Sequence, residues 1–488
     1  MQKTLFVKIS IIASLCIFFV IGLTMFSSVI TERQYYADSV VAEIADQHVN
    51  PQEVITPFIT IPSTVTSECL LTADKASKCP APYTKVDTIF ATQTSATQDL
   101  AVSTDTYQRG IYHATSYSGD IKFKQSYVLK EKSAALETLN LETTDNSAVE
   151  LTTTDTGLLD TTNIASDNTQ STARQNVTHW NEAKLIIPIS DLRGVATLPI
   201  VTIDGQPSKA TYPQTFMLNG LSYVEVTLPN NVIAQLKANA TTTQNTSNTQ
   251  SSTLTANDSV NTALDIIIDL PLSGISNLNT VPTGQNFELT MRSNWHAPNF
   301  IGKALPNAKN FTADGFEANW QNQYLTVANN QYLSQCLNTP NNQCDVISEA
   351  NLHSAKYSAD NPSNYEVAAV AIEDAYVPPN STDLSSVRLN SFGVSFAEPN
   401  DVYLQTERTM KYALLLILVS FGTFFLFEII KSSRIHPIQY LLVGCALLTF
   451  YVLLLPLAEQ IAFWQAYAIA ATACVGLIGW YSYYVLYS

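Results

Sequence analysis

The stretch TERTMKYALLLILVSFGTFFLFEIIKSSRIHPIQYLLVGCALLTFYVLLL, residues 406–455, decides the architecture of this chain. It holds most of two apolar runs, 410–430 and 438–456. At about 1.5 Å per residue, a helix of this length reaches about 30 Å and crosses the hydrocarbon core of a bilayer. The link between them, 431–437, is short and carries Lys431 and Arg434. Two apolar runs joined by a basic link are typical of a multi-pass membrane protein.

Two further apolar runs predict membrane spans at 9–30 and 461–481. The first follows Lys3 and Lys8, which a cleaved signal peptide would also carry. Its uncharged run is too long for a signal peptide, however, and no small-residue cleavage site follows it. Cys16 is preceded by the bulky Leu15, which argues against lipoprotein processing. We therefore predict a retained anchor and four spans in total.

The charge of the chain is unevenly distributed. The full sequence has 488 residues and a formal net charge of −16, with 14% charged residues. The apolar ends, 1–30 and 408–488, hold six bases and two acids, which leaves 19 bases and 39 acids for residues 31–407. An acidic middle between apolar ends predicts one large domain outside the membrane. The acidity also excludes a general nucleic-acid binder, and the 46% hydrophobic content excludes a disordered chain.

The positive-inside rule sets the expected orientation. It places the N-terminus, 1–8, and the basic link, 431–437, in the cytoplasm. The domain 31–409 and the acidic link 457–460 then lie on the outer side, and 482–488 form the C-terminal end. Arg408 and Lys411 count against this orientation, but two spans separate Lys8 from Arg434, which is consistent with it.

The outer domain reads as mainly β. Segments rich in β-branched and aromatic residues predict strands at 58–62, 111–124, 184–189, 198–203, 223–228, 263–270, 286–293, 365–372 and 387–396. Asp204-Gly205 is a turn signal, and short helices are expected at 231–237 and 325–337. Residues 142–178 and 239–262 are dominated by Thr, Ser, Asn and Gln, so we expect exposed, mobile loops there. The fold class is thus a helical membrane region with a sandwich-like β-domain.

Four cysteines of the outer domain form two local pairs, Cys69 with Cys79 and Cys336 with Cys344. Outside the cytoplasm such pairs are typical of disulfides. A zinc site is the alternative, but it favours closer ligand spacing, such as two residues between cysteines. The remaining three, at positions 16, 445 and 474, fall in apolar spans, where a lone cysteine is usually a small buried hydrophobe.

One aromatic cluster could form a binding surface: Trp295, His296, Phe316 and Trp320. Aromatic side chains offer large contact areas with a polar handle. The simpler interpretation, which we favour, places them in the core and in the turn between two strands. No phosphate-binding, nucleophile-elbow or zinc-protease motif occurs in the chain. We therefore expect no catalytic residues, no metal and no cofactor.

Glu428 is the acid inside an apolar span, and an intramembrane charge is a functional hypothesis by default. It could serve as a proton or cation site. It lies close to the cytoplasmic end, however, and Lys431 follows one helical turn later. An interfacial ion pair is therefore the favoured interpretation.

Several strings of this sequence together resemble the CreD family of bacterial inner-membrane proteins. They are TERQYY (31–36), ITPFITIP (55–62), RGIY (109–112), SDLRG (190–194), the stretch 293–320 and, above all, 406–455. The resemblance covers almost the whole chain apart from the two polar low-complexity segments. Two features depart from the family: the cysteine pairs, and the end of the chain after four spans where family members have more. We expect a chain truncated at its C-terminus.

This resemblance implies an inner-membrane protein of Gram-negative bacteria that acts in cell-envelope integrity or the envelope-stress response. The family offers no enzymatic activity to carry over. The expected partners are the lipid bilayer and envelope components or other inner-membrane proteins. A transporter or permease component and a membrane-anchored periplasmic enzyme are the alternatives.

Overall fold

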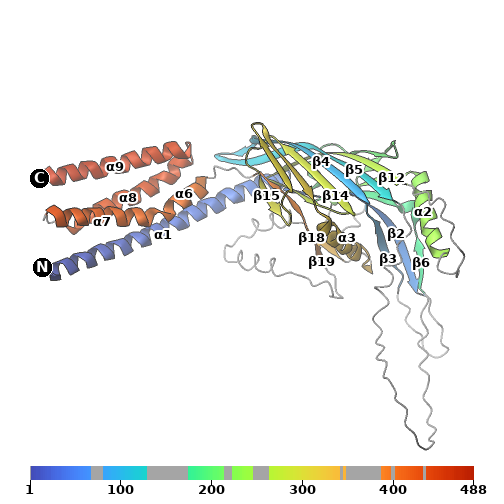
Figure 1. Cartoon of the computed structure of the whole chain (residues 1–488), viewed down its shortest axis with the longest axis horizontal. Helices are drawn as coiled ribbons and strands as arrows, with labels where there is room; N and C mark the ends of the chain where they lie inside the picture. Colours follow the sequence, from blue (N-terminus) through green and yellow to red (C-terminus); the bar gives the residue numbers. More distant parts are fainter. Residues whose placement is uncertain are drawn as a thin grey trace, which may run out of the picture.

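A bundle of long helices and a domain of two large sheets form the two ends of this molecule (Figure 1). The computed structural model describes residues 2–67, 81–128, 174–213, 222–245, 263–340, 344–347, 386–396, 402–431 and 436–487. The predicted strand at 365–372 and the pair Cys69 and Cys79 lie outside these residues, as does most of the first low-complexity segment.

Among the described residues, the helical bundle contains four candidate membrane spans, as predicted. Its helices are α1 (Gln2–Gln47), α6 (Val402–Lys411), α7 (Ala413–Lys431), α8 (Pro437–Ala458) and α9 (Phe463–Tyr487). The second candidate span, Val402–Phe427, joins α6 and most of α7, so it begins earlier than the predicted 410. Helix α9 continues to Tyr487, past the predicted boundary at 481.

Both basic ends of the bundle lie away from the sheets. In Figure 1 the N-terminus of α1 and the C-terminal end of α7 are at the same end of the bundle. The α8–α9 link lies at the other end, where the Tyr403 hydroxyl of α6 donates to the Glu459 carboxylate at 3.2 Å. The helices therefore have the alternating direction that the positive-inside argument assumed.

Helix α1 is longer than predicted, and residues 31–47 belong to it rather than to the β-domain. The segment after the apolar run is amphipathic, with one buried stripe at Ala37, Val40, Ile44 and Ala45. This stripe has helical spacing and packs on Ala114 of β5 and Ile275 of β12. The prediction of a domain beginning at 31 is wrong because the apolar run and this stripe continue without a helix-breaking residue.

Two sheets form the domain. Sheet A contains β10 (Ala210–Thr211), β11 (Ser222–Thr227), β7 (Lys184–Ile189), β1 (Gln52–Ile55), β13 (Asn277–Val281), β20 (Phe392–Ser395) and β15 (Asn299–Gly302) in spatial order. Strand β2 (Phe58–Ser67) extends it by pairing with β7, β3 (Tyr83–Ile89) and β6 (Arg174–Thr178). Sheet B has the order β16 (Ala308–Thr312), β17 (Gly315–Gln321), β14 (Asn286–Ser293), β4 (Gln93–Arg109), β5 (Tyr112–Val128), β12 (Ala263–Ile275), β8 (Ile200–Ile203) and β9 (Gln206–Ser208).

The two sheets share one apolar core, which confirms the sandwich-like prediction. Leu185 and Ile187 of sheet A lie in the same buried cluster as Phe123 and Leu270 of sheet B. Alternate residues of these strands point inward, as period-two patterning requires. A smaller pair of strands, β18 (Asp345–Ile347) and β19 (Ser386–Arg388), lies beside helix α3 (Gln323–Leu337).

Every predicted strand that falls on described residues is present, although 387–396 is divided into β19 and β20, which lie in different sheets. Several further strands were not predicted, and the following differences are the most instructive. Strand β4 was missed because its 17 residues are mostly Thr, Ser, Gln and Asp. Residues 174–178, predicted as part of a loop, form β6 and pair with β2. Helix α2 (Asn230–Asn245) continues past residue 239 into the second predicted loop. In each case the polar composition predicts a loop, but pairing with a neighbouring strand, or continuation of the preceding helical turn, determines the structure.

The Asp204-Gly205 prediction is confirmed. These two residues connect β8 and β9, and their φ angles are 49° and 75°. Positive φ at both central positions is the type I′ geometry that favours Asp-Gly in two-residue hairpins. This turn sets the register of the β8–β9 pair at the edge of sheet B.

Candidate functional site

Two of the family-like strings, far apart in sequence, meet at the end of α1. Residues 109–112 form the tip of the long β4–β5 hairpin, and residues 190–194 follow β7. Both lie against the last turns of α1 and the residues that follow it. We name this contact the junction, defined by residues 43–53, 109–112 and 190–194. It connects the first membrane helix to the β-domain.

Asp191 and Arg193 form the centre of the junction. The Arg193 guanidinium donates to both carboxylate oxygens of Asp191, at 2.6 Å and 3.0 Å, and to the backbone oxygen of Asp46 on α1. The backbone N–H of Asn50 donates to Asp191 Oδ2 at 3.0 Å. Charge-assisted bonds of this kind are the strong class of hydrogen bond. Asp191 and Arg193 thus hold the end of α1 from a loop far along the chain. The Asn50–Asp191 contact spans 141 positions and the Asp46–Arg193 contact spans 147.

The pKa of Asp191 lies below its usual value. Burial by itself would raise this pKa, because the Asp191 side chain is only 11% exposed. The hydrogen bonds from Arg193 and from the N–H of Asn50 favour the ionised form and outweigh burial. The bond to Asp191 also raises the pKa of Arg193. The carboxylate is therefore charged in the folded junction over the whole neutral range.

Backbone and amide groups complete the attachment. The Ser190 hydroxyl accepts from the N–H of Glu53 at 2.8 Å, and Gln52 donates to the carbonyl of Asp191 at 3.0 Å. A Cβ added at Gly194 would lie 2.4 Å from both Gln52 Nε2 and the carbonyl oxygen of Ser273. The glycine is therefore required by close packing against β12. A larger residue there would push the loop away from α1.

The hairpin tip makes the second half of the junction. Arg109 forms an ion pair with Glu43 at 2.7 Å and donates to Gln47 at 3.0 Å. Tyr112 packs edge-to-face on Tyr36 of α1, with ring centroids 5.8 Å apart. Gly110 has a φ of 63° at the first central position of the two-residue turn, as in type II′ hairpins. The turn geometry thus aims Arg109 and Tyr112 at one helix.

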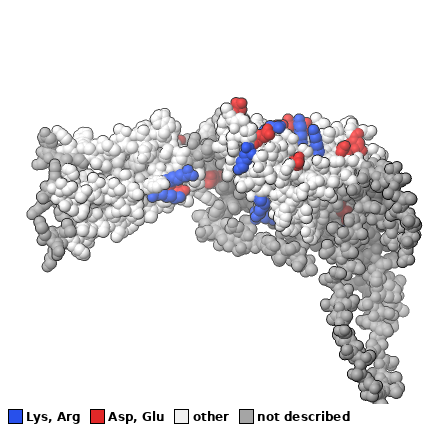
Figure 2. Space-filling view, in the orientation of Figure 1, with Lys and Arg blue, Asp and Glu red and all other residues white. Residues whose placement is uncertain are grey.

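The same region contacts the other membrane helices. Tyr403 of α6 interacts with Tyr112 of the hairpin and donates to Glu459 at the α8–α9 link. Helix α6 carries an internal ion pair, Glu407 with Lys411 at 2.9 Å, at the boundary to α7. The charged side chains in Figure 2 lie over the β-domain and at this domain-facing end of the helices. The junction is therefore polar and sits where the membrane region ends.

The predicted aromatic surface is divided between core and rim. Trp320 and Phe316 are buried, with 1% and 4% exposure, and Trp320 stacks on Phe392 at 5.5 Å. Trp295 is partly buried and donates to the carbonyl of Ala297 at 3.1 Å. His296 is exposed, and its Nε2 lies 2.8 Å from the carbonyl oxygen of Ala313. Two of the four residues therefore belong to the sandwich core and only His296 is exposed.

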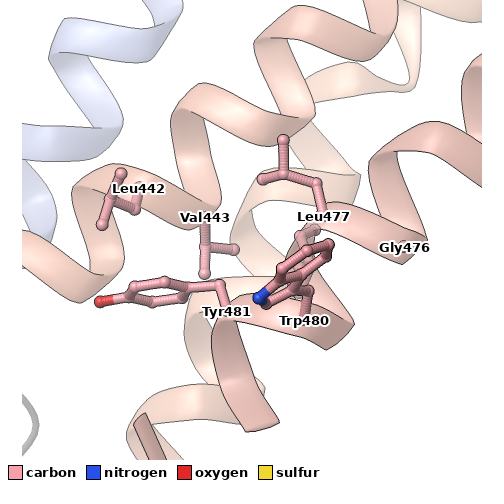
Figure 3. A pocket seen from close by; sticks show the side chains of 7 residues that line it. Leu442, Val443, Gly476, Leu477, Trp480 and Tyr481 are labelled. Carbon is pink, nitrogen blue, oxygen red and sulfur yellow. The ribbon is translucent and has the colours of Figure 1, made fainter. Parts of the chain in front are cut away.

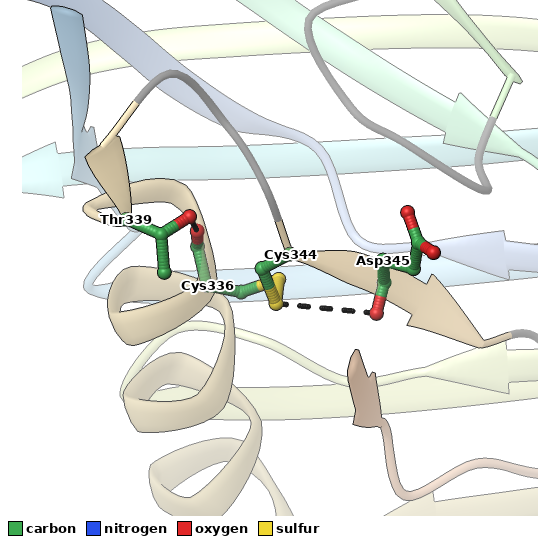
Figure 4. Close-up of a disulfide and its surroundings, with 4 residues drawn as sticks. All are labelled: Cys336, Thr339, Cys344 and Asp345. Atoms are coloured by element: carbon green, nitrogen blue, oxygen red, sulfur yellow. Dashed lines mark hydrogen bonds between the residues drawn. A yellow bond between two sulfur atoms is a disulfide. The ribbon is translucent and has the colours of Figure 1, made fainter. Parts of the chain in front are cut away.

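Cys336 and Cys344 are joined by a disulfide (Figure 4). It connects the end of α3 to the start of β18 and is buried in a second apolar cluster with Leu333, Leu337 and Val346. This cluster lies on the side of sheet A opposite the main core, where it also contains Ile186 and Phe58. The disulfide therefore holds α3 and the following strand against sheet A.

The described residues of the membrane region form an apolar groove. The backbone of Glu428 lies in α7, but its side chain is outside what the structure describes. A groove of about 540 Å³ lies between α8 and α9 and is lined by Leu442, Val443, Gly476, Leu477, Ile478, Trp480 and Tyr481 (Figure 3). Such a lining matches the hydrocarbon of a bilayer. Within the described residues, no group of three potential metal ligands is present.

The sequence pointed to parts of the junction without showing their role. The strings 109–112 and 190–194 resemble the CreD family, but a base beside a glycine, as each contains, more often marks a turn than a functional site. Nothing in the sequence indicated that Glu43, Gln47 and Asn50 are contact partners, because their role depends on where helix α1 ends. The amphipathic stripe of residues 37–45 could have shown that α1 continues into the domain.

Comparison with known proteins agrees with the resemblance. The family model described as "Inner membrane protein CreD" matches residues 4–175 and 156–488. The "Inner membrane protein CreD" of Escherichia coli (strain K12) is 33% identical over 208 residues, which are 43% of this chain and 36% of that protein. The chain therefore matches about a third of the length of this relative.

A solved structure, the M1 zinc metallopeptidase from Deinococcus radiodurans, aligns with 48% of this chain and 38% of its own at 8% identity and a TM-score of 0.18. A similarity this low carries no argument about fold or activity. The family match, by contrast, extends over both the β-domain and the membrane helices. The chain belongs to the CreD family of inner membrane proteins.

Proposed function

We propose that this protein is a non-enzymatic component of the bacterial envelope that couples the state of an outer, periplasmic domain to its membrane helices. In this way it would contribute to envelope integrity or to the response to envelope stress. Lipid surrounds its helices, and the domain faces envelope components or partner proteins.

The observation that carries the proposal is the junction. A single helix, α1, runs from the membrane segment into the β-domain, and its end is bound by Asp191, Arg193 and the hairpin tip. Tyr403 extends the contact to α6 and the α8–α9 link. A rigid helix fixed at its end by charged pairs transmits a displacement of the domain to the membrane region.

The charge distribution supports the periplasmic position. The start of α1 and the end of α7 lie at the end of the bundle away from the sheets, and in the sequence these points adjoin Lys3, Lys8, Lys431 and Arg434. The positive-inside rule assigns this end to the cytoplasm. The disulfide between Cys336 and Cys344 is typical of an oxidising compartment.

The proposal is tested by complementation of a deletion strain. Cells that carry the wild-type gene, an Arg193→Ala variant or an Arg292→Ala variant are compared for detergent sensitivity and for uptake of a large hydrophilic dye. We expect Arg193→Ala to behave like the deletion and Arg292→Ala like the wild type, at equal protein levels in the membrane.

Arg292 is the matched control because it is also paired, with Glu317 at 2.8 Å and Asp99 at 3.6 Å, but on an exposed face of sheet B. Unchanged envelope permeability in the deletion strain, with loss of uptake of a defined solute, would instead favour a permease. A full rescue by Arg193→Ala would show that the junction is not needed.

A further inference from the structure

A polar pocket lies on sheet A across β13, β20 and β15, beside strand β1, in which the junction residue Glu53 lies opposite Asn279. Its volume is about 370 Å³. Three asparagines, one serine and one lysine line it, together with Ile301 and Gly302: Asn277, Asn279, Asn299, Ser395 and Lys303. Proteins commonly use such sets of carboxamides and hydroxyls to orient small polar ligands.

The strand register explains why these side chains meet. On β20, Ser395 lies opposite both Asn277 of β13 and Asn299 of β15. Two residues earlier, Gly393 lies opposite both Asn279 and Ile301. Residues two apart share one face of a strand. The row of Asn277, Ser395 and Asn299 and the row of Asn279, Gly393 and Ile301 therefore lie on the same face of sheet A. The alternate residues Leu278, Phe392 and Val394 point into the sandwich core.

One residue of the pocket, Asn279, has a buried oxygen that accepts no hydrogen bond from the described residues. Asn279 is 3% exposed, and the oxygen concerned is its Oδ1. A buried acceptor left unpaired destabilises a fold, and in native proteins such a group often marks a functional site. The side chains of Asn277, Asn299, Ser395 and Lys303 likewise have no partner among the described residues.

Gly393 leaves room for the Asn279 amide beside the pocket. A Cβ at this position would lie 2.7 Å from Asn279 Oδ1 and 2.0 Å from the carbonyl oxygen of Leu278. Any other residue would therefore displace the Asn279 amide and the neighbouring strand. The absence of a side chain at Gly393 and the presence of polar groups around it make a concave, hydrogen-bonding surface.

We propose that this pocket binds a saccharide unit that carries an acetamido group and a carboxylate. The three carboxamides offer paired donors and acceptors, which match vicinal hydroxyls and an acetamido group. Ile301 offers an apolar contact to the sugar ring or the acetyl methyl, and the free ammonium of Lys303 matches the carboxylate. The polar groups lie on the face of the sheet, so they fit a compact ligand better than a peptide that pairs along a strand edge.

The choice of a saccharide rests on the proposed function, which places the domain in the periplasm, where cell-wall glycan is present. The existence of the pocket does not depend on that placement. Binding is measured by titration calorimetry with the full chain in detergent micelles. The probes are N-acetylmuramic acid, N-acetylglucosamine, which lacks the carboxylate, and an N-acetylated Ala-Glu dipeptide.

We expect N-acetylmuramic acid to bind most tightly and the dipeptide most weakly. Asn279→Leu should weaken sugar binding by at least about tenfold, because the bound sugar loses a hydrogen-bond partner in a site that binds through hydrogen bonds. The same variant should raise the melting temperature, because it removes an unpaired buried acceptor. Lys303→Gln should reduce the affinity for N-acetylmuramic acid to that for N-acetylglucosamine.

The matched control is Asn310→Leu, at an exposed asparagine of sheet B, which should change neither affinity. If Asn279→Leu does not fold, Asn299→Ala at an exposed position must weaken sugar binding. No heat of binding with either sugar, unchanged affinity in these variants, or tighter binding of the dipeptide would overturn the inference. These results are independent of the Arg193 complementation test, so the failure of one proposal is distinguishable from that of the other.

Discussion

The Arg193 side chain bridges two parts of the molecule, because it binds Asp191 beside it and the backbone of Asp46 at the end of α1. We expect Arg193→Ala to lower the free energy of unfolding of the β-domain by about 1–2 kcal/mol, since the mostly buried Asp191 carboxylate loses its cation while Arg193 itself is partly exposed. The measurement is thermal or urea unfolding followed by tryptophan fluorescence in detergent.

The control for this prediction is Arg292→Ala, whose ion pairs are exposed on both sides. Its effect should be within about 0–1 kcal/mol, as is usual for surface pairs. Equal losses for the two variants would mean that Arg193 acts as an ordinary surface residue.

Asp191 should also make stability depend on pH in a narrow acidic range. Its folded pKa lies below the unfolded value of about 3.9, so its contribution is fully present above about pH 4. That contribution is lost as the pH falls through the lowered folded pKa. The difference in melting temperature between the wild type and Asp191→Asn should therefore be largest near neutral pH and shrink below about pH 4. A constant difference across this range would contradict the role of the carboxylate.

Among the elements, the contact of α1 with α8 depends on one glycine. A Cβ at Gly444 would lie 2.1 Å from the ring of Phe19, which is 1% exposed and packs edge-to-face on Phe421 at 5.9 Å. We expect Gly444→Ala to destabilise the helical bundle by about 1–3 kcal/mol, because overpacking forces side chains or helices apart. The measurement is the midpoint of unfolding in mixed detergent.

Gly476→Ala is the matched control within the same bundle, since a Cβ there meets nothing within 4 Å. In a helix, alanine is favoured over glycine by up to about 1 kcal/mol, so this change should be neutral or stabilising. If both variants behaved alike, the close approach of α1 and α8 at Gly444 would be incorrect.

The disulfide between Cys336 and Cys344 should stabilise the attachment of α3 and β18. The two residues are separated by eight positions, and closing a loop of this length contributes about 2.5 kcal/mol in the chain-entropy account. We expect a Cys336→Ser, Cys344→Ser double variant to lose about this amount, and a reductant to lower the stability of the wild type by at least as much. Cys445→Ser, which alters a free exposed thiol, should have no effect.

For the whole molecule, the proposed orientation predicts which sites an impermeant maleimide can reach. In a variant whose Cys16, Cys445 and Cys474 are replaced by serine, Ala308→Cys on exposed β16 should be labelled in EDTA-treated whole cells. Ser433→Cys in the link after α7 should be labelled only after lysis. The reverse pattern would place the β-domain in the cytoplasm and remove the basis of the proposed function.

The sandwich and the membrane bundle were predictable because both depend on local patterns. Span length follows from the number of consecutive apolar residues, and strands such as 263–270 and 286–293 follow from period-two alternation. Strand β4 was not predictable in this way. Its polar residues form a central strand only because β5 and β14 pair with it on both sides.

The four apolar spans, the mainly β character of the acidic middle and the likeness to a known family thus follow from the order of the residues along the chain. Three features emerge from the packing alone: α1 enters the domain, Arg193 meets Asp46, and the Asn279 Oδ1, beside Gly393, accepts no hydrogen bond from the described residues. The physical reason is the range of the interactions. Apolar length and alternation are properties of neighbouring residues, whereas these contacts join residues more than 100 positions apart that only packing of the complete chain brings together.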